Sequence, residues 1–337
     1  MFVVLLLTMS LPFIVAQNEK SGENRFVSVK GKDLITPDGE VFLMKGINLG
    51  NWLNPEGYMF LFQDVNSYRL IDQALKEMVG PDFVNRFWRE FQENYISRDD
   101  IRYIRQTGMN SIRVPFHYKL FTCEDFMGSN NPNRGFELLD SVIQWCKEEE
   151  LYVVLDMHAA PGGQTGDNID DSYGYPWLFE SSESQALFCA IWKRIAEHYA
   201  DEPTVLGYDL LNEPIAHFFD NKDELNRHLE PLYMKAAEAI REVDKNHILI
   251  LGGAQWNTNF SVFTNPGFDD KMMYECHTYW TDTTQAAIQH FLDFREKTNL
   301  PMYMGETGEN TDEWIEGFRR LLERNHMGWH FWPYKKM

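Results

Sequence analysis

The sequence of 337 residues is poor in basic side chains, and its one long apolar run lies at the very start. Its 31 lysines and arginines face 51 aspartates and glutamates, so the formal net charge is −20 at pH 7. This deficit excludes a nucleic-acid binder that relies on a basic face, and a role that needs a polybasic membrane patch. We therefore expect neither nucleic acid nor a membrane as partner of the mature protein.

Cysteine is scarce, and no pair of cysteines has the Cys-x-x-Cys spacing of a structural zinc site. Export would permit disulfides, but three of the four lie in apolar periodic segments, where a buried free thiol is the commoner outcome. The pairing of Cys123, Cys146, Cys189 and Cys276 therefore stays open. No Gly-x-Gly-x-x-Gly or P-loop pattern follows any apolar run, which argues against a doubly wound nucleotide-binding sheet.

The apolar run Met1–Ala16 carries no charged side chain. It is too short for a transmembrane helix, which needs about 20 residues, and has the size of a signal-peptide core. We predict a leader over residues 1–16, cleaved before Gln17, although no lysine or arginine precedes it. A buried first helix is the alternative. Residues 17–337 are then expected to form one catalytic domain, either secreted or periplasmic.

Eight short apolar runs follow, and they read as nearly continuous hydrophobic segments, as parallel strands covered on both faces require. They are Val41–Gly50, Ser111–His117, Tyr152–His158, Val205–Glu213, Ile248–Ala254, Met272–Trp280, Met302–Thr307 and Gly328–Trp332. Helical patterns alternate with them, so the predicted fold class is α/β, a (β/α)8 TIM barrel. Alternation in Arg25–Phe42, around the turn Pro37-Asp38-Gly39-Glu40, predicts an N-terminal β-hairpin.

The expected helices include two extra ones before the first regular helix of the barrel. They are Ser67–Gly80, Asp82–Tyr95, Arg98–Thr107, Phe136–Glu150, Ser184–Tyr199, Lys222–Val243, Thr284–Lys297 and Asp312–Asn325. Only five residues follow the last apolar run, so the eighth helix is missing. Either the barrel closes without it or the chain is truncated at its C-terminal end, and we favour a fragment.

Polar residues concentrate where the apolar runs stop, which in a barrel is the face that carries active sites. Glu213 and Glu306 lie at the ends of the fourth and seventh runs and would face each other across the mouth. Two carboxylates about 5–5.5 Å apart suit retaining glycoside hydrolysis. Glu306 as nucleophile must stay ionised, held by Arg113 and the Tyr279 hydroxyl, whereas Glu213 must begin protonated. Asn212 is placed to bind a sugar 2-hydroxyl.

A set of short motifs in this order resembles glycoside hydrolase family 5, a retaining (β/α)8 family. The motifs are Ile112-Arg113-Val114-Pro115, Asp156-Met157-His158, Leu211-Asn212-Glu213-Pro214, His277-Thr278-Tyr279, Gly305-Glu306-Thr307 and Trp332, and Gly46–Leu53 is similar to the first strand of exo-β-1,3-glucanase-like members. The resemblance implies Glu213 as acid/base and Glu306 as nucleophile. It implies that substrate or carboxylates are positioned by Arg113, His158, Asn212, His277, Tyr279 and Trp332.

Ten tryptophans suggest stacking platforms for sugar rings, and we expect Trp332 and Trp52 at the site. The expected activity is endo- or exo-hydrolysis of a β-linked glucan polysaccharide or oligosaccharide by a monomer, without metal or other cofactor. The linkage stays open, with β-mannan as a further substrate. A non-catalytic carbohydrate-binding barrel is the competing class. A metal-dependent hydrolase using His158 and His277 is third, because no His-x-His follows the first strand.

Overall fold

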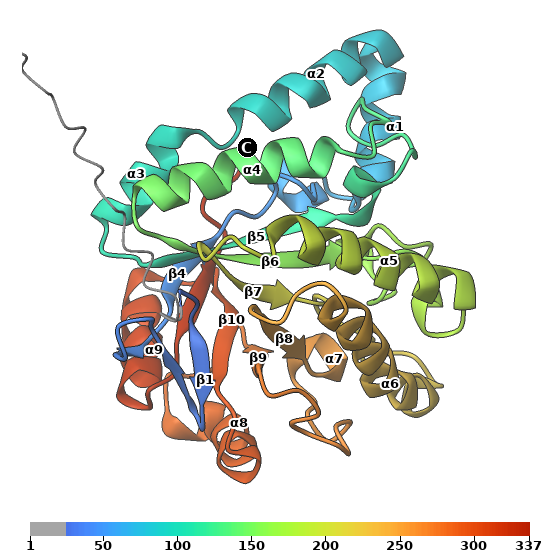
Figure 1. The fold of residues 1–337 in the computed structure, drawn as a ribbon. Coiled ribbons are helices and arrows are strands. Elements are labelled where there is room, and N and C mark those ends of the chain that lie inside the picture. Colours follow the sequence, from blue (N-terminus) through green and yellow to red (C-terminus); the bar gives the residue numbers. More distant parts are fainter. Residues whose placement is uncertain (1–24) are drawn as a thin grey trace, which may run out of the picture.

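Eight parallel strands close into a barrel in the computed structural model, which describes residues 25–337 (Figure 1). The strands run around the barrel in the order β10-β11-β4-β5-β6-β7-β8-β9. The predicted (β/α)8 barrel is therefore confirmed. The expected leader, Met1–Ala16, lies outside the described residues.

The barrel strands coincide closely with the predicted apolar runs. They are β4 (Lys45–Asn48), β5 (Ser111–His117), β6 (Tyr152–Ala159), β7 (Val205–Asp209), β8 (Ile248–Gly252), β9 (Met272–His277), β10 (Met302–Gly308) and β11 (Trp329–Trp332). Every residue of β5, β7, β8, β9, β10 and β11 is buried, because side chains fill the interior and helices cover the outside. Burial on both faces explains why the runs are apolar without alternation.

The first barrel strand is shorter than predicted, because Val41–Phe42 belongs to the N-terminal sheet. That sheet contains β1 (Ser28–Lys30), β2 (Asp33–Ile35) and β3 (Val41–Phe42), all antiparallel, so the predicted hairpin carries a third strand. Val27 and Leu34 pack in one buried cluster with residues near the starts of the barrel strands. The sheet therefore closes the end of the barrel opposite the expected site.

The helices also follow the predicted order. They are α1 (Tyr68–Val79), α2 (Pro81–Asn94), α3 (Arg98–Gln106), α4 (Arg134–Glu148), α5 (Ser182–Tyr199), α6 (Lys222–Arg241), α7 (Ala254–Asn257), α8 (Gln285–Thr298) and α9 (Asp312–Arg324), with 3-10 turns at η1 (Gly57–Phe60), η2 (Tyr118–Phe121), η3 (Asn168–Asp170) and η4 (Trp177–Phe179). Helix α3 begins with the capping box of Ser97 and Asp100. Between β8 and β9 stands only the single turn α7, which places Asn257 beside the barrel interior.

The last strand, β11, pairs with β4 and closes the barrel without a helix in residues 333–337. This short segment is tied to the start of the barrel: the Tyr334 backbone N–H donates to the Asn48 carbonyl, and the Tyr334 hydroxyl donates to Asp100. The expected truncation at the C-terminal end stays a prediction.

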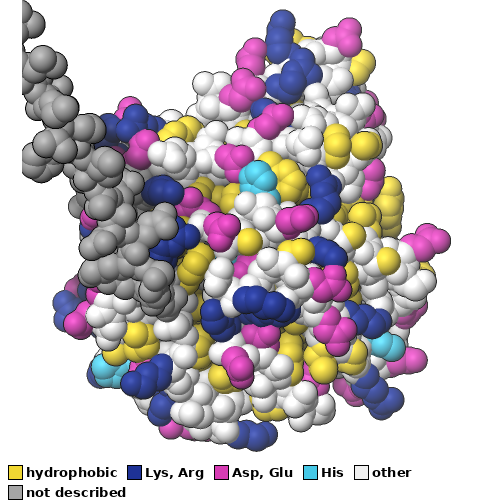
Figure 2. Space-filling view, viewed as in Figure 1, with side chains coloured by type: hydrophobic (Ala, Val, Ile, Leu, Met, Phe, Trp, Pro, Cys, Tyr) yellow, Lys and Arg dark blue, Asp and Glu magenta, His cyan; other side chains and the backbone are white. Residues whose placement is uncertain are grey.

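The four cysteines all lie within residues 25–337 and are free thiols, with Cys146 and Cys276 buried. In the same residues, no helix combines the length and the apolar character that crossing a membrane requires. Figure 2 shows basic and acidic side chains intermixed over the face in view.

Candidate active site

A cavity of about 640 Å³ opens at the carboxyl ends of the barrel strands. Six of the predicted site residues line it, namely His158, Glu213, His277, Tyr279, Glu306 and Trp332. They come from β6, β9, β10, β11 and the loops after β7 and β9, because parallel strands all end at one mouth. The structure therefore brings together residues that are up to 174 positions apart.

Arg113 lies beneath the cavity floor on β5 and is fully buried. Its guanidinium donates to Glu306 Oε1 at 2.6 Å and to Asn212 Oδ1 at 2.9 Å. It also forms ion pairs with Asp156 at 3.1 Å and Asp209 at 2.7 Å. A buried arginine of this kind fixes several acceptors at once, since its five N–H groups form a rigid fork.

Glu306 is held at both carboxylate oxygens. Oε1 accepts from Arg113, and Oε2 accepts from the Tyr279 hydroxyl at 3.0 Å. Burial raises the pKa of the Glu306 carboxyl, and the positive charges of His277, Arg113 and His158 oppose that rise. The hydrogen bonds from Arg113 and Tyr279 are the two that we predicted, and both favour the ionised form.

Glu213 stands just beyond β7 with a left-handed backbone, φ 45°. This conformation is uncommon for a residue with a Cβ, and functional sites are where such strain collects. The loop after β6 holds it: the Thr165 hydroxyl donates to the Glu213 carbonyl, and Gln164 donates to the Asn212 carbonyl. The Glu213 side chain is 13% exposed and contacts His277 Nδ1 through Oε1 at 2.8 Å.

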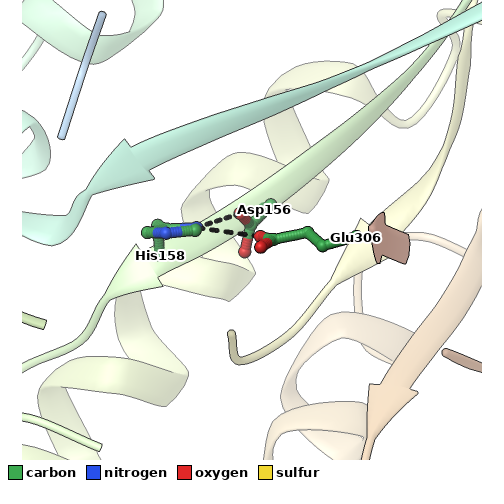
Figure 3. A group of neighbouring side chains, drawn as sticks. All are labelled: Asp156, His158 and Glu306. Atoms are coloured by element: carbon green, nitrogen blue, oxygen red, sulfur yellow. Dashed lines mark hydrogen bonds and ion pairs between the residues drawn. The ribbon is translucent and has the colours of Figure 1, made fainter. Parts of the chain in front are cut away.

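Two histidines flank Glu306 from opposite sides. His158 Nδ1 lies 2.7 Å from Asp156 Oδ2 and 4.0 Å from Glu306 Oε1, and Figure 3 shows both carboxylates pointing at the same edge of the ring. His277 Nδ1 lies 3.7 Å from Glu306 Oε2. Although burial disfavours an imidazolium, the charges and hydrogen bonds of the nearby carboxylates raise the pKa of both histidines. Positive charge therefore surrounds Glu306.

Two groups of side chains are spaced closely enough to ligate a metal ion, Asp156–His158–Glu306 and Glu213–His277–Glu306. Both contain Glu306, which lies 2.6 Å from the Arg113 guanidinium. A cation bound at either group would be repelled by that fixed charge at close range. The donor sets are therefore better suited to hydrogen bonding among themselves than to a metal.

Trp332 forms one wall of the cavity. Its ring stacks parallel to His158, with centroids 5.2 Å apart, and its Nε1 donates to the Tyr58 hydroxyl at 2.7 Å. Gly50 leaves the room for this ring, because a Cβ there would stand 2.8 Å from the indole. The predicted sugar platform thus lies in the cavity wall.

Trp52 does not lie at the site, which corrects our expectation. It is 1% exposed and donates from Nε1 to the Gln92 carbonyl of α2 at 2.8 Å. The extra helices α1 and α2 cover the position where Trp52 leaves the first strand. Its role is therefore to pack these helices onto the barrel.

The sequence interpretation missed several polar residues of the site. Glu56 and Tyr58 line the cavity from the loop after β4, and Asp156, Asp209 and Glu275 are buried below it. The period of two along a strand would have indicated Asp156 and Glu275, since each precedes a site histidine by two residues. Burial raises the pKa of Glu56 to about 8, and its Oε1 has no hydrogen-bond partner among the described residues.

Comparison with known proteins agrees with this geometry. The family model "Cellulase (glycosyl hydrolase family 5)" matches residues 74–337. The chain belongs to glycosyl hydrolase family 5. The predicted enzyme class, an O-glycosyl hydrolase, is thereby confirmed at the level of the family.

Curated relatives carry several activities. A "Beta-xylosidase" of Phanerodontia chrysosporium is 32% identical over 71% of this chain, which spans about half (48%) of that relative's length. "Endoglucanase C" of Acetivibrio thermocellus is 26% identical, with 74% of this chain and 87% of the relative covered. A "Probable glucan 1,3-beta-glucosidase A" of Aspergillus clavatus is 25% identical, with coverages of 84% and 69%. These names differ in substrate within one family.

Solved structures share the fold. An endogalactoceramidase superposes with a TM-score of 0.69 at 17% identity, covering 92% of this chain and 75% of the other. Endoglucanase Cel5A of Thermotoga maritima gives 0.59 at 21% identity, with coverages of 86% and 89%. At these identities the likeness supports the barrel and carries no further assignment.

Proposed function

We propose that the protein is a retaining β-glycosidase that hydrolyses a β-linked glucan, with Glu306 as nucleophile and Glu213 as acid/base. One observation carries the proposal: a carboxylate oxygen of Glu213 lies within 4.8 Å of one of Glu306 across the cavity. This spacing fits the separation of about 5–5.5 Å of retaining enzymes and leaves too little room for the water of an inverting one.

In the first step the Glu306 carboxylate attacks the anomeric carbon, and the bond to the leaving oxygen breaks as Glu213 transfers its proton to that oxygen. Arg113 and Tyr279 aim the two oxygens of Glu306 and leave one lone pair of each free for the attack. The product is a glycosyl ester of Glu306 and a released alcohol.

In the second step Glu213, now ionised, takes a proton from water, and the resulting hydroxide equivalent attacks the same anomeric carbon. The ester bond breaks and Glu306 leaves as a carboxylate. The His277 ring, 2.8 Å from Glu213, keeps that carboxyl turned toward the cavity in both steps. Two inversions at one carbon give net retention.

The sugar bound next to Glu306 is expected to stack on Trp332, because apolar sugar faces favour indole rings. Glu56 lines the cavity at the same place and has an oxygen left to bond a hydroxyl. Asn212, which we expected to bind the sugar, is fully buried and contacts Arg113 and His158 instead of lining the cavity. The endoglucanase and glucan 1,3-beta-glucosidase relatives favour a glucan as substrate. Product profiles on laminarin, pustulan, carboxymethylcellulose and mannan will identify the linkage and distinguish endo from exo cleavage.

Stereochemistry tests the mechanism. Proton NMR during early turnover should show the β-anomer of the product first, and an initial α-anomer would refute a retaining reaction. Glu213→Gln and Glu306→Gln should each lower kcat by at least about 10³-fold on a substrate with a poor leaving group, while melting as the wild type does. Glu309→Gln is the matched control, since Glu309 also lines the cavity but pairs with Lys336. A carbohydrate-binding barrel without catalysis would show binding but no turnover in any form.

We further propose that Met1–Ala16 is a secretion leader, since this uncharged apolar run has the length of a signal-peptide core. The mass of protein exported from an expression host should correspond to a chain that starts at Gln17. An exported chain that retains Met1 would contradict this.

A further inference from the structure

Glu275 is a buried carboxylate that the mechanism above does not use. It stands on β9 two residues before His277, so both side chains point into the barrel. Its Oε1 accepts from Asn257 Nδ2 at 2.7 Å and lies 3.6 Å from His277 Nε2, while Oε2 accepts from the Tyr303 hydroxyl at 3.1 Å. The carboxylate is thus fixed directly beneath the histidine that contacts Glu213.

Two glycines leave the space that this arrangement needs. A Cβ on Gly305 would stand 2.2 Å from Glu275 Oε2, and a Cβ on Gly252 would stand 2.1 Å from Asn257 Oδ1. Any larger residue at either position would displace the carboxylate or the amide that holds it. Glu275 and Asn257 therefore fit in the barrel interior only because positions 305 and 252 carry no side chain.

We propose that Glu275 is a positioning residue for the acid/base Glu213, acting through His277. Glu275 and Asn257 hold the Nε2 edge of the ring, which turns Nδ1 toward Glu213 at 2.8 Å. Glu275 touches no part of the cavity, so it acts on the reaction through its neighbours, His277 and Arg113. Arg113 lies 3.5 Å from Glu275 but has closer partners in Glu306, Asp209 and Asp156, so we assign the effect of Glu275 to the ring. This inference rests on the proposed roles of Glu213 and Glu306.

The charged and titratable groups around Glu275 come from six other elements. They are Arg113 on β5, Asp156 on β6, Asp209 on β7, Tyr233 on α6, Tyr303 and Glu306 on β10, and His330 on β11. Burial and repulsion by Glu275 raise the pKa of Asp209. Burial is also the largest single influence on Glu275, but Arg113, His277 and Asp209 together outweigh it and lower the pKa of Glu275. The two carboxyls are therefore coupled, and the presence of Glu275 disfavours the ionised form of Asp209.

Because Asp209 is coupled to Glu275, Glu275→Gln should change the stability of the fold only slightly. Without repulsion from Glu275 the pKa of Asp209 falls, and Arg113, 2.7 Å away, favours its ionised form. The variant then lacks a negative charge at the position that faces His277 Nε2. We expect this variant to fold and to melt within a few degrees of the wild type.

The second carboxylate–histidine pair provides a matched control. Asp156 Oδ2 lies 2.7 Å from His158 Nδ1, so Asp156 holds this ring as Glu275 holds that of His277. His158, however, lies beside Glu306 and Trp332, where the proposed mechanism places the glycone. Asp156→Asn should therefore slow the attack by Glu306 for every leaving group. Glu275→Gln should slow only reactions that need a proton from Glu213.

The experiment compares kcat/KM on the 2,4-dinitrophenyl and phenyl β-glycosides of one gluco-oligosaccharide. Dinitrophenolate leaves without a proton, whereas phenolate needs general-acid help, an effect commonly worth about 10²–10⁴-fold. Glu275→Gln should lose at least about tenfold on the phenyl glycoside and less than about twofold on the dinitrophenyl glycoside. Asp156→Asn should lose about equally on both. The wild-type rates come first and test the proposed function by themselves.

Equal losses of Glu275→Gln on both substrates would show a merely structural role and overturn the inference, as would no loss on either. If Glu275→Gln does not fold, Asn257→Ser provides the second route, because it removes the amide that holds Glu275 Oε1 and faces His277 Nε2. The same selective loss is expected there, and an unselective loss or none would likewise overturn the inference.

Discussion

Replacing Glu56 by glutamine should make the protein more stable at alkaline pH while leaving it unchanged at acid pH. Glu56 is 3% exposed, and burial raises the pKa of its carboxyl from 4.5 to about 8. The nearest opposite charge is His158, whose Nε2 lies 3.8 Å away. In the folded protein Glu56 is therefore a neutral acid at neutral pH, which glutamine reproduces in size and polarity.

The direction of this pKa shift determines how the stability of the folded protein changes with pH. A carboxyl whose pKa is higher in the folded than in the unfolded chain favours folding fully below about pH 4.5, and this contribution disappears as pH rises through about 8. A rise of this size corresponds to on the order of 5 kcal/mol between the two extremes, an upper figure because water entry and relaxation reduce it. The wild type should lose that stability between about pH 5 and pH 9, and the variant should not.

Urea unfolding at pH 5, 7 and 9 measures the difference. Wild type and Glu56→Gln should coincide at pH 5, and the variant should unfold at higher urea at pH 9, by a free energy of unfolding of a few kcal/mol. Glu40→Gln, at an exposed position of the N-terminal sheet, is the control and should follow the wild type throughout. Parallel curves for wild type and Glu56→Gln across this range would refute the reasoning.

Three further predictions concern other parts of the molecule. Trp52→Phe should lower the free energy of unfolding by about 1–3 kcal/mol through loss of the bond to Gln92, and an altered KM would contradict its placement in the core. Reducing agent should leave Tm unchanged because all four thiols are free, and a lower Tm would reveal a disulfide. Activity should survive dialysis against EDTA, since Arg113 already neutralises Glu306, and a loss restored by a divalent metal would contradict this.

The barrel was predictable because its strands are buried on both faces, so each strand is a nearly continuous run of apolar residues in the sequence. β5 is buried at all seven residues and was predicted with its observed bounds. Val41–Phe42 was predicted both in the hairpin and in the first barrel run, because the apolar run continues from the N-terminal sheet into the barrel with no turn residue to separate them. Only the hairpin assignment is confirmed. The end of β7 was placed too late for a similar reason, since the buried segment up to Asn212 continues beyond the last ladder bond.

The residues at the cavity floor were only partly predictable. Glu213 follows the buried strand β7 and Glu306 lies near the end of the buried strand β10, and these positions reveal them. Trp52 also follows a strand, but helices α1 and α2 cover it, and no local pattern shows which strand end an insertion will bury. Glu56 lies in a loop and Asn257 ends the single turn α7, and in both places the tertiary fold sets the side-chain direction. Asn257 has a left-handed backbone, φ 57°, which the sequence gives no reason to expect.

Arg113 explains why so many carboxylates can be buried beneath one site. Alone, each of Asp156, Asp209, Glu275 and Glu306 would be costly to ionise, but all four lie within 3.5 Å of one guanidinium. Within this network Glu306 acts on the substrate, and Asp156 and Glu275 act on one histidine each. Such a network adds little to stability, because the desolvation of its members offsets their attraction. Its use is to hold charge in fixed directions, and this is what a reaction that creates and removes charge at a sugar carbon requires.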